Sequence, residues 1–456
     1  MLVYKAYFSI LLIFAACLST SAQIVDSAQQ SILTAEAGPE DASVNRVRGE
    51  KILKEVKETI EKHYYDKTYK GIDLDSTYKA AREKIKTFDH NWQIFRVIAQ
   101  FVMQFDDSHT RFYPPNRAVT VDYGFDMQMI GNVCYIVNVK KGSDAEKKGL
   151  KVGDVLAGIH QYNPTRENLW KINYILRSLD PLSKINVFIL GPDKKEQKIE
   201  VEAKFISIKA RNEDAKERRK NFEPYRCHEV DAEVIACRLE TFSVDKDVIN
   251  DMMKEVRGHG RLVLDLRGNG GGLVEIEEYL LGHFFDTDIK VGDFVTRKKT
   301  EERIAKSRGD KVFKGDLTVL IDSRSASAAE VFARVIQIEE RGKVMGDVSS
   351  GSVMTSYLIG SSIRRGSGEL MTLTVFSMNV TVGDLIMTDG KRLEKVGVTP
   401  DVAIGPSGFA LSNGDDPILA HAVRDFGGEM TDAEAGQLKF LTKRYNWSED
   451  EDLEDQ

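Results

Sequence analysis

The sequence contains few cysteines, no metal-ligand motif and no long apolar run after its first residues. Four cysteines among 456 residues exclude a disulfide-dense scaffold. Neither His-Glu-x-x-His nor Cys-x-x-Cys occurs, so no metal centre is expected. The chain also lacks an apolar run of the roughly 20 residues that span a bilayer, which excludes a polytopic membrane protein.

The sequence also lacks a large excess of positive or negative charge. The chain carries 64 basic and 71 acidic side chains, a net charge of -7, without the concentrated positive charge of a nucleic-acid-binding protein. The basic stretch at 206–222 is interpreted as the solvated face of a linker helix. With 42% hydrophobic and 30% charged residues, the chain is expected to form a buried core rather than to remain disordered.

The N-terminus has the layout of a secretory signal peptide. Lys5 supplies one positive charge, Ala6–Leu18 is apolar apart from Ser9, and small residues end the segment at Ala22. A core of about 13 residues is short for a membrane span, so we expect cleavage and export to the periplasm or the medium. Cys17 leaves lipid anchoring as the weaker alternative.

Changes of periodicity divide the chain into segments. Apolar residues at helical spacing are followed by β-branched runs, and strand and helix patterns alternate from about residue 230, which indicates an α/β layer with a largely buried sheet. The expected segments are a signal peptide (1–22), a flexible leader (23–44), an N-terminal helical domain (45–116), a β-rich domain (117–205), a linker (206–229), an α/β core (230–430) and an acidic tail (431–456).

Three cysteines lie beyond the signal peptide. Cys134 and Cys237 occur in apolar, strand-like runs, which favours small buried side chains over reactive thiols. Cys227 has more polar neighbours and is left unassigned.

Two buried strands each run directly into a turn of small residues that is followed by a helix. The first turn is Asp265–Gly272, whose glycines can aim backbone amides at a phosphate or at an oxyanion. The second, Asp322–Glu330, exposes serines at a helix start, where the helix dipole favours a developing anion. Both turns also have a structural interpretation, as a tight strand–helix connection and as an ordinary serine N-cap.

Two further segments carry residues of catalytic type. Asp106–Pro115 places His109 next to a hydroxyl and near two carboxylates, and Asp389–Asp401 contains Glu394, which could orient a histidine. Taken alone, His109 is better explained as a structural histidine and Glu394 as a surface carboxylate.

In their order, these four segments resemble the carboxyl-terminal processing (tail-specific) serine peptidases and their tricorn-core relatives, over roughly residues 45–425. The motifs that carry the resemblance are Asp265-Leu-Arg-x-Asn-x-Gly-Gly272, Ser325-Ala-Ser-Ala-x-Glu330, an Asp-x-His-Thr element and Gly397-Val-x-Pro-Asp401. The resemblance implies an α/β catalytic core of ClpP/crotonase-like type, preceded by an N-terminal helical domain and an inserted PDZ domain.

The implied PDZ domain is the β-rich segment, in which Tyr123, Gly124, Phe125 and Asp126 resemble the carboxylate-binding loop. A PDZ groove takes up an extended peptide by strand addition and holds its terminal carboxylate on loop amides. The partners implied by the resemblance are therefore polypeptides, captured near their C-termini.

The resemblance makes Ser327 the nucleophile, with the backbone N–H groups of Ala328 and Gly271 as oxyanion-hole donors. Tail-specific peptidases activate this serine with a lysine 25 residues further along the chain, but Ser352 occupies that position. The nearest lysine, Lys343, lies in a strand-like run and would need a different geometry to act as the base.

The tricorn-like branch uses a histidine instead. In that branch a Ser-His pair precedes the PDZ domain and a later glutamate supports the histidine. Ser108, His109 and Glu394 match these three residues, so the resemblance implies that His109 is general base and acid, that Glu394 orients it and that Ser108 supports the network.

Together these features predict a secreted serine endopeptidase that forms an acyl-enzyme on Ser327, with a pH profile rising through the histidine range of about 6–7. No metal, organic cofactor or nucleic acid is implied, and because relatives often assemble, a homo-oligomer stays open. The alternative is a catalytically inactive protein on the same scaffold that binds a peptide or a hydrophobic ligand, since the missing lysine also fits a dead site. A crotonase-type acyl-CoA enzyme is disfavoured by the PDZ-like insert and the export signal.

Overall fold

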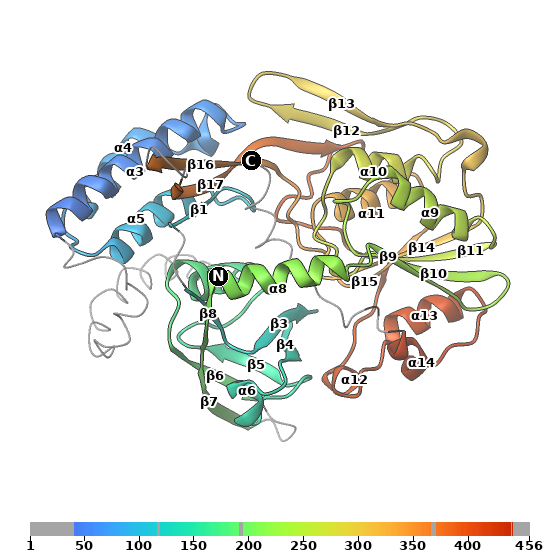
Figure 1. The fold of residues 1–456 in the computed structure, drawn as a ribbon. Coiled ribbons are helices and arrows are strands. Elements are labelled where there is room, and N and C mark those ends of the chain that lie inside the picture. Colours follow the sequence, from blue (N-terminus) through green and yellow to red (C-terminus); the bar gives the residue numbers. More distant parts are fainter. Residues whose placement is uncertain (1–40, 116–118, 191–194, 366–370, 439, 441–456) are drawn as a thin grey trace, which may run out of the picture.

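The computed structural model describes residues 41–115, 119–190, 195–365, 371–438 and 440 (Figure 1). The predicted signal peptide, most of the predicted leader and the end of the acidic tail lie outside these residues. Within them, no helix is both long and apolar enough to cross a membrane.

The N-terminal segment folds into three helices, α3 (Ala42–His63), α4 (Leu74–Ile85) and α5 (Asn91–Met103). Val56 and Ile60, which repeat at helical spacing in the sequence, are fully buried. Because one face of each helix is apolar, the helices need a further surface to pack against.

That surface comes from the far end of the chain. The hairpin of β16 (Thr355–Arg365) and β17 (Met371–Met387) reaches across to the helices (Figure 1). Phe376, Met378 and Val380 of β17 join the hydrophobic core of the helices. The short strand β1 (Arg111–Tyr113), which follows α5, pairs antiparallel with β17.

The β-rich segment forms an antiparallel five-stranded sheet in the order β3-β4-β5-β6-β7. Its strands are β3 (Phe125–Ile130), β4 (Val133–Val139), β5 (Val155–Ile159), β6 (Lys184–Leu190) and β7 (Glu196–Glu202). The helix α7 (Leu169–Tyr174), which continues into a π turn at Ile175–Leu179, lies between β5 and β6 in sequence. Since β3 is the first strand in this order, its outer edge pairs with no described strand.

Three shorter elements complete this segment. The strand β2 (Val119–Asp122) pairs antiparallel with β8 (Lys204–Ser207), and α6 (Asp144–Lys147) precedes β5. The charged helix α8 (Ile208–Lys220) buries none of its residues and leads from here to the next sheet (Figure 1). It is therefore a solvated connection, as the sequence predicts.

The C-terminal half contains a six-stranded sheet in the order β18-β15-β14-β11-β10-β9. In this sheet β10, β11, β14, β15 and β18 run parallel to one another, and β9 is antiparallel to β10. They are β9 (Tyr225–Glu229), β10 (Val234–Leu239), β11 (Arg261–Asp265), β14 (Asp316–Ile321), β15 (Lys343–Gly346) and β18 (Val402–Ala403). The predicted apolar runs at 234–239, 261–266 and 317–321 thus lie side by side at the centre of the sheet.

Helices cover both faces of this sheet, which explains the continuous apolar runs of its strands. One face packs against α9 (Lys246–Val256), α10 (Val274–Leu281) and α11 (Ala328–Ile338), and the other against α13 (Pro417–Asp425) and α14 (Asp432–Gln437). Phe440 is also buried in the second of these cores, so the fold continues to the last described residue.

A second hairpin, of β12 (Ile289–Thr296) and β13 (Thr300–Ala305), pairs with the end of β17 and extends the sheet that contacts the N-terminal helices. The sequence analysis did not predict this hairpin. The helix α12 (Gly408–Asn413) follows β18.

One cysteine, Cys237, differs from its prediction. Cys227 and Cys237 lie directly opposite each other on β9 and β10 and form a disulfide, so Cys237 is not an isolated buried thiol. Cys134 is a buried free cysteine. Periodicity identified the strand of Cys237 but could not show its antiparallel partner.

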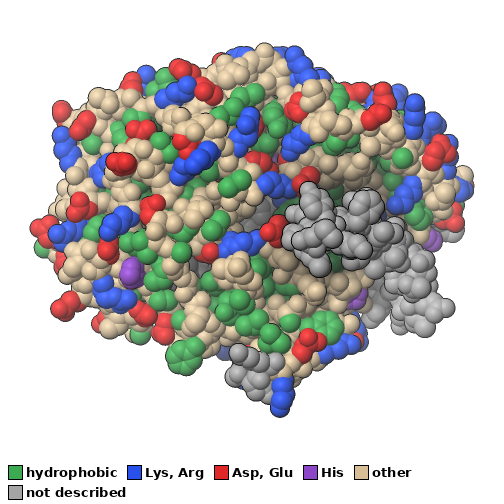
Figure 2. Space-filling view, turned by 180° about the vertical axis from the view of Figure 1, so that it is seen from behind, with side chains coloured by type: hydrophobic (Ala, Val, Ile, Leu, Met, Phe, Trp, Pro, Cys, Tyr) green, Lys and Arg blue, Asp and Glu red, His purple; other side chains and the backbone are tan. Residues whose placement is uncertain are grey.

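Charges of both signs are mixed on one face of the surface. Figure 2 shows acidic and basic side chains interspersed over one face of the molecule, without a stripe of one sign. The small net charge of the sequence is thus not the sum of two large opposed patches on that face.

Candidate active site

Ser327 stands at the turn between β14 and α11, with its backbone in an unusual conformation. Its φ is 53° and its ψ -121°, a region that side-chain-bearing residues rarely adopt and that tends to mark functional sites. The turn is fixed from behind by Asp322, which accepts hydrogen bonds from the N–H groups of Arg324 (2.9 Å) and Ser325 (3.1 Å). Ser327 is half-buried at the start of a helix.

The glycine turn after β11 lies against this serine. A side chain at Gly271 would place its Cβ 2.6 Å from the Cβ of Ser327, so only glycine fits there. Asn269 holds the two turns together, because its carbonyl accepts the N–H of Ala326 (2.9 Å) and its side chain donates to the carbonyl of Leu239 (3.0 Å). The carboxyl ends of β11 and β14 therefore build one site.

The two predicted oxyanion-hole donors differ in the structure. The N–H of Ala328 has no hydrogen-bond partner among the described residues and lies beside Gly271. The N–H of Gly271, in contrast, donates to Oδ1 of Asn269 (2.8 Å), so it is not free. In the same turn the N–H groups of Gly270 and Gly272 have no described partner.

The Asp and Arg of the glycine-turn motif are buried scaffold. The Arg267 guanidinium, 1% exposed, donates to both carboxylate oxygens of Asp265 and to both of Asp416. These charge-assisted bonds tie the end of β11 to the start of α13. The predictive strength of this motif therefore comes from a structural anchor beside the site.

His109, Ser108 and Glu394 meet although their segments are far apart in sequence. Oγ of Ser108 lies 2.6 Å from Nδ1 of His109 and donates to Oε2 of Glu394 (2.8 Å), and the Ser108 N–H donates to Oε1 of Glu394 (2.7 Å). Since the hydroxyl has one proton, which it gives to the carboxylate, this network assigns the imidazole proton to Nδ1. Nε2 is then left as a proton acceptor.

Burial changes the protonation of this group. Desolvation, with a contribution from Arg111, lowers the pKa of His109 from 6.5 to about 4, below the range of an unperturbed histidine. Desolvation also raises the pKa of the Glu394 carboxyl, against the hydrogen bonds from Ser108. At neutral pH His109 is therefore the neutral imidazole that a general base must be.

Asp107, which the sequence analysis did not single out, holds the histidine turn. It accepts hydrogen bonds from the N–H of His109 (3.0 Å), the hydroxyl of Thr110 (2.9 Å), the hydroxyl of Thr381 (3.0 Å) and the phenol of Tyr64 (3.0 Å). The Asp-x-His-Thr spacing was the available signal, because an aspartate commonly bonds to backbone N–H groups two or three residues further along the chain.

The segment 349–353 connects the serine and the histidine groups. The N–H of Ser327 donates to the carbonyl of Ser352 (2.8 Å), and the N–H of Val353 donates to Oε2 of Glu394 (3.3 Å). No hydrogen bond joins Ser327 directly to His109 in the described part of the chain. The structure thus brings the predicted residues into one neighbourhood without closing the last contact.

Glu330 is a second residue that the sequence analysis quoted without assigning it a role. It is fully buried, and its carboxylate accepts hydrogen bonds from Ser349, Gly351, Ser352 and Ser327. Desolvation raises its pKa from 4.5 to about 7, against the effect of these bonds.

Lys343, the alternative base, does not reach the site. It is the first residue of β15, level with Thr318 in β14, and its ammonium pairs with Asp425 at 2.7 Å. Its side chain is 57% exposed. The geometry therefore rules out Lys343 as the base in this structure.

The predicted peptide-binding loop is occupied by groups of the chain itself. The N–H of Gly124 donates to Oδ1 of Asp122 (2.9 Å), and Tyr123 is buried with its hydroxyl bonded to the carbonyls of Leu176 and Leu182. Asp126 accepts a bond from Asn138 (2.9 Å).

The outer edge of β3 is closed in the same way. Its three outward carbonyls accept side-chain donors: Phe125 from Arg177 (3.1 Å), Met127 from Arg324 (2.7 Å) and Met129 from Ser323. Ser323 and Arg324 belong to the loop just before Ser327. The β-rich segment thus touches the nucleophile turn through the edge that strand addition would use.

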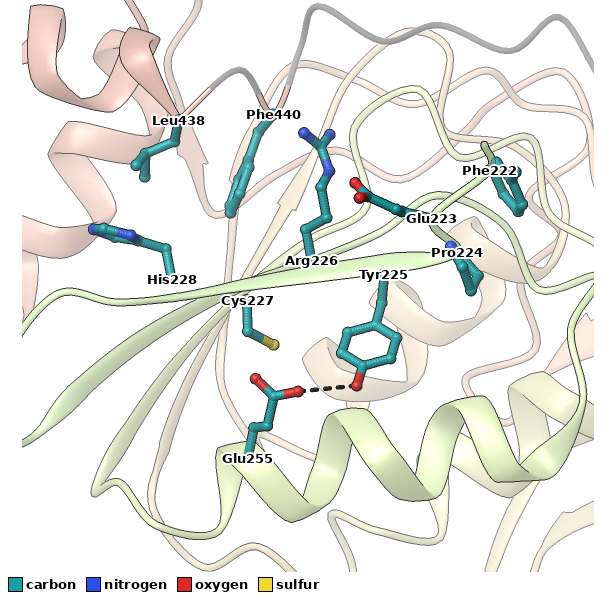
Figure 3. Close-up of a pocket in the computed structure, with 10 residues that line it drawn as sticks. All are labelled: Phe222, Glu223, Pro224, Tyr225, Arg226, Cys227, His228, Glu255, Leu438 and Phe440. Atoms are coloured by element: carbon teal, nitrogen blue, oxygen red, sulfur yellow. Dashed lines mark hydrogen bonds between the residues drawn. The ribbon is translucent and has the colours of Figure 1, made fainter. Parts of the chain in front are cut away.

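A pocket of about 640 Å³ lies elsewhere, beside β9. Figure 3 shows Tyr225 and Cys227 on one side of the strand, toward Glu255 of α9, and Arg226 and His228 on the other. It contains none of the predicted site residues, and the chemistry described above does not depend on it.

Comparison with known proteins agrees with this geometry. Residues 234–404 match the sequence model of peptidase family S41. The chain is 23% identical to the chloroplastic C-terminal processing peptidase of Tetradesmus obliquus, over 76% of this chain and 75% of that protein. It is 25% identical to the carboxy-terminal processing protease CtpB of Bacillus subtilis, over 74% of this chain and 67% of that one.

Among solved structures, that of mature CPAF is similar in fold, with a TM-score of 0.62 at 13% identity over 81% of this chain and 94% of that one. The matched core contains the serine turn and the glycine turn, and the relatives are peptidases. The chain is thus a serine-type peptidase. Its similarity to peptidase family S41 lies in residues 234–404, which include the mixed α/β core.

Proposed function

We propose that this peptidase hydrolyses polypeptides by a serine–histidine mechanism, with Ser327 as nucleophile and His109 as base. The observation that carries the proposal is the Glu394–Ser108–His109 network, which assigns the proton to Nδ1 and leaves Nε2 to accept the proton of Ser327. Position 352, where a lysine would stand in the serine–lysine branch, is a serine next to Ser327.

In this mechanism Oγ of Ser327 attacks the scissile carbonyl while its proton passes to Nε2 of His109. The C–N bond then breaks, and His109 returns the proton to the leaving amine. Water hydrolyses the acyl-enzyme by the reverse transfers. Glu394 stabilises the imidazolium through Ser108 during both steps.

The oxyanion formed in each step needs backbone donors. We assign one to the N–H of Ala328, which is free beside Gly271. The second is an amide of the glycine turn. Gly271 can supply it only by leaving Asn269, whereas Gly270 and Gly272 need not break a bond.

We further propose that residues 117–205 form a PDZ domain that takes up substrate C-termini along β3. Its loop amides and edge carbonyls are those that strand addition uses. Capture requires Arg324 and Ser323 to leave the carbonyls of Met127 and Met129. A bound peptide therefore acts directly on the loop that carries Ser327.

The remaining parts of the proposal concern place and assembly. We propose export on the basis of the N-terminal segment 1–22, with lipid anchoring through Cys17 as the weaker route, and a ClpP/crotonase-like ancestry for the core. A homo-oligomer stays open. No metal or organic cofactor enters the mechanism.

Fluorophosphonate labelling tests the proposal. The wild-type enzyme is expected to label and to cleave an unfolded polypeptide, and Ser327→Ala and His109→Ala are expected to abolish cleavage. Lys343→Ala serves as the matched control and should retain full activity. An unlabelled Ser327 in an enzyme that still binds peptide would favour the inactive binding protein instead.

A further inference from the structure

The Glu330 carboxylate receives four hydrogen bonds and no described cation contacts it. Oε1 accepts the hydroxyl of Ser349 (2.6 Å) and the N–H of Gly351 (2.6 Å). Oε2 accepts the N–H of Ser352 (2.9 Å) and that of Ser327 (3.0 Å). The side chain is 0% exposed, so water cannot replace these donors.

Only an ionised carboxylate satisfies this arrangement. An ionised carboxylate has acceptor sites and no proton, whereas a protonated acid or an amide presents a hydrogen from one of its two heavy atoms. Three of the four donors are backbone N–H groups, which cannot turn into acceptors. An amide nitrogen at this position therefore leaves at least one backbone donor facing another donor. A protonated acid can keep all three backbone bonds only if the Ser349 hydroxyl, which already accepts the Val398 N–H (2.6 Å), gives up its own bond to the carboxylate.

These bonds end on the parts of the proposed active site that need precise placement. One donor is the N–H of Ser327, whose positive φ is otherwise unfavourable. The three others lie in the segment 349–352, which leads to Val353 and its contact with Glu394. Glu330 therefore fixes the nucleophile relative to the carboxylate that supports the base.

We propose that Glu330 is a positioning residue whose ionised form assembles the active site, an inference that rests on the serine mechanism proposed above. Its pKa, raised by burial to about 7, brings the required ionisation into the neutral range. The pKa of His109 is lowered to about 4, so the histidine is already neutral there. We therefore expect activity to rise with pH through about 7 as Glu330 ionises.

Few other groups can titrate near this carboxylate. The segment 349–353 contributes none. The charged or titratable residues of the neighbouring segments, and of its own helix, are Glu394 and Lys395 after β17, His109 and Asp107 in the histidine turn, Asp322 and Arg324 before the nucleophile, Asp347 before the segment 349–353, Arg267 in the glycine turn and Arg334 on α11. Asp322 and Arg267 are held in hydrogen bonds of their own.

The experiment is the pH profile of kcat and KM for wild type and Glu330→Gln. Wild-type kcat is expected to rise through about pH 7, because protonation of Glu330 below that pH disrupts the four hydrogen bonds that its carboxylate accepts. The amide variant is expected to be about a hundredfold slower, the scale of a small misplacement of a reacting group, with KM within about twofold. Its kcat should no longer rise between about pH 5.5 and 8, since the carboxylate that titrates near pH 7 is gone and the pKa of His109 is about 4.

Two further variants complete the design. Ser349→Ala removes one donor and keeps the carboxylate, so the rise in kcat should move to higher pH. Glu339→Gln, at an exposed glutamate that caps the end of the same helix, should match wild type. If Glu330→Gln fails to fold, Ser349→Ala alone decides between the outcomes.

The two proposals fail in different ways. A rise near pH 7 that survives in Glu330→Gln, or that Ser349→Ala does not move, overturns the role of Glu330 while Ser327 still labels with fluorophosphonate. A wild-type enzyme whose Ser327 labels at no pH overturns the serine mechanism itself.

Discussion

Individual side chains at this site act mainly by orienting their neighbours through hydrogen bonds. Ser108 links Glu394 to His109, and Asn269 engages one amide of the glycine turn while leaving its neighbours without partners. Asp107 satisfies the backbone of the histidine turn. Nε2 of His109, which the proposed mechanism uses as the proton acceptor, is occupied by no such bond among the described residues.

Replacement of Glu394 by Gln tests the orienting carboxylate. The amide nitrogen cannot accept the proton of the Ser108 hydroxyl, so the proton on Nδ1 of His109 loses its support. We expect kcat to fall by about 10²–10⁴, the range for loss of acid–base assistance or of its orienting group, with KM little changed. Steady-state kinetics with Asp389→Asn as the surface control measure this. An equal fall in both variants would contradict the assignment.

At the scale of elements, the core is held by buried polar anchors between strand ends and helix starts. Arg267 joins β11 to α13, and Asp322 bonds both to the nucleophile loop and to the N–H of Gly268 in the glycine turn (2.8 Å). The pairing of β11 with β14 places the ends of the two strands side by side, but it does not fix the turns that follow them. The buried anchors hold these two turns in place relative to each other.

Replacement of Arg267 by Ala is expected to destabilise the fold by about 3–5 kcal/mol, since it leaves Asp265 and Asp416 as buried carboxylates with a missing partner. Urea unfolding measures the change in the free energy of unfolding. Lys314→Ala, which removes an exposed ion pair with Asp286, should leave it unchanged. A similar small effect of both substitutions would refute the anchoring role.

The cross-strand disulfide gives a second prediction at this scale. Replacing Cys227 and Cys237 together by Ser removes a link across 10 residues, and we expect a loss of about 2–3 kcal/mol from the greater freedom of the unfolded chain. Chemical denaturation with and without a reductant measures it. The wild type should fall to the level of the variant under reduction, and no change would show that the link carries no stability.

Sequence patterns predicted the central strands and their turns well, because buried parallel strands read as continuous apolar runs and glycine turns follow them. They did not predict the β12–β13 hairpin or the destination of β17. Phe376 and Val380 alternate as expected of a strand, but alternation does not identify the surface that a strand covers. The hydrogen bonds of Asp107 and Glu330 depend on segments hundreds of residues apart or on buried loops, which no local pattern contains.

In the whole molecule, the β-rich segment contacts residues beside both the histidine turn and the nucleophile turn. Its helix α7 places Trp170 over the guanidinium of Arg111 (4.3 Å), next to the histidine turn. Its edge strand β3 binds the side chains of Ser323 and Arg324, next to the nucleophile. A displacement of this segment therefore reaches both His109 and Ser327.

Combined replacement of Ser323 and Arg324 by Ala is expected to free the edge of β3. Amide hydrogen exchange should then increase in 125–130, and the affinity for C-terminal peptides should rise, because the edge no longer has to be vacated. The double variant Lys299→Ala and Glu301→Ala, which removes an exposed ion pair of the β12–β13 hairpin, serves as the control. Exchange and peptide affinity that match wild type would show that these contacts do not close the edge.

The pairing of β1 with β17 bears on how the chain is made. Thr110, next to His109, bonds to Thr381, which is 271 residues further along. The helices of the N-terminal segment thus lack part of the surface they pack against until β17 has been synthesised, and contacts of such long separation form late. Before that point a nascent chain cannot hold the proposed catalytic histidine in place, so it cannot cleave other chains by the proposed mechanism.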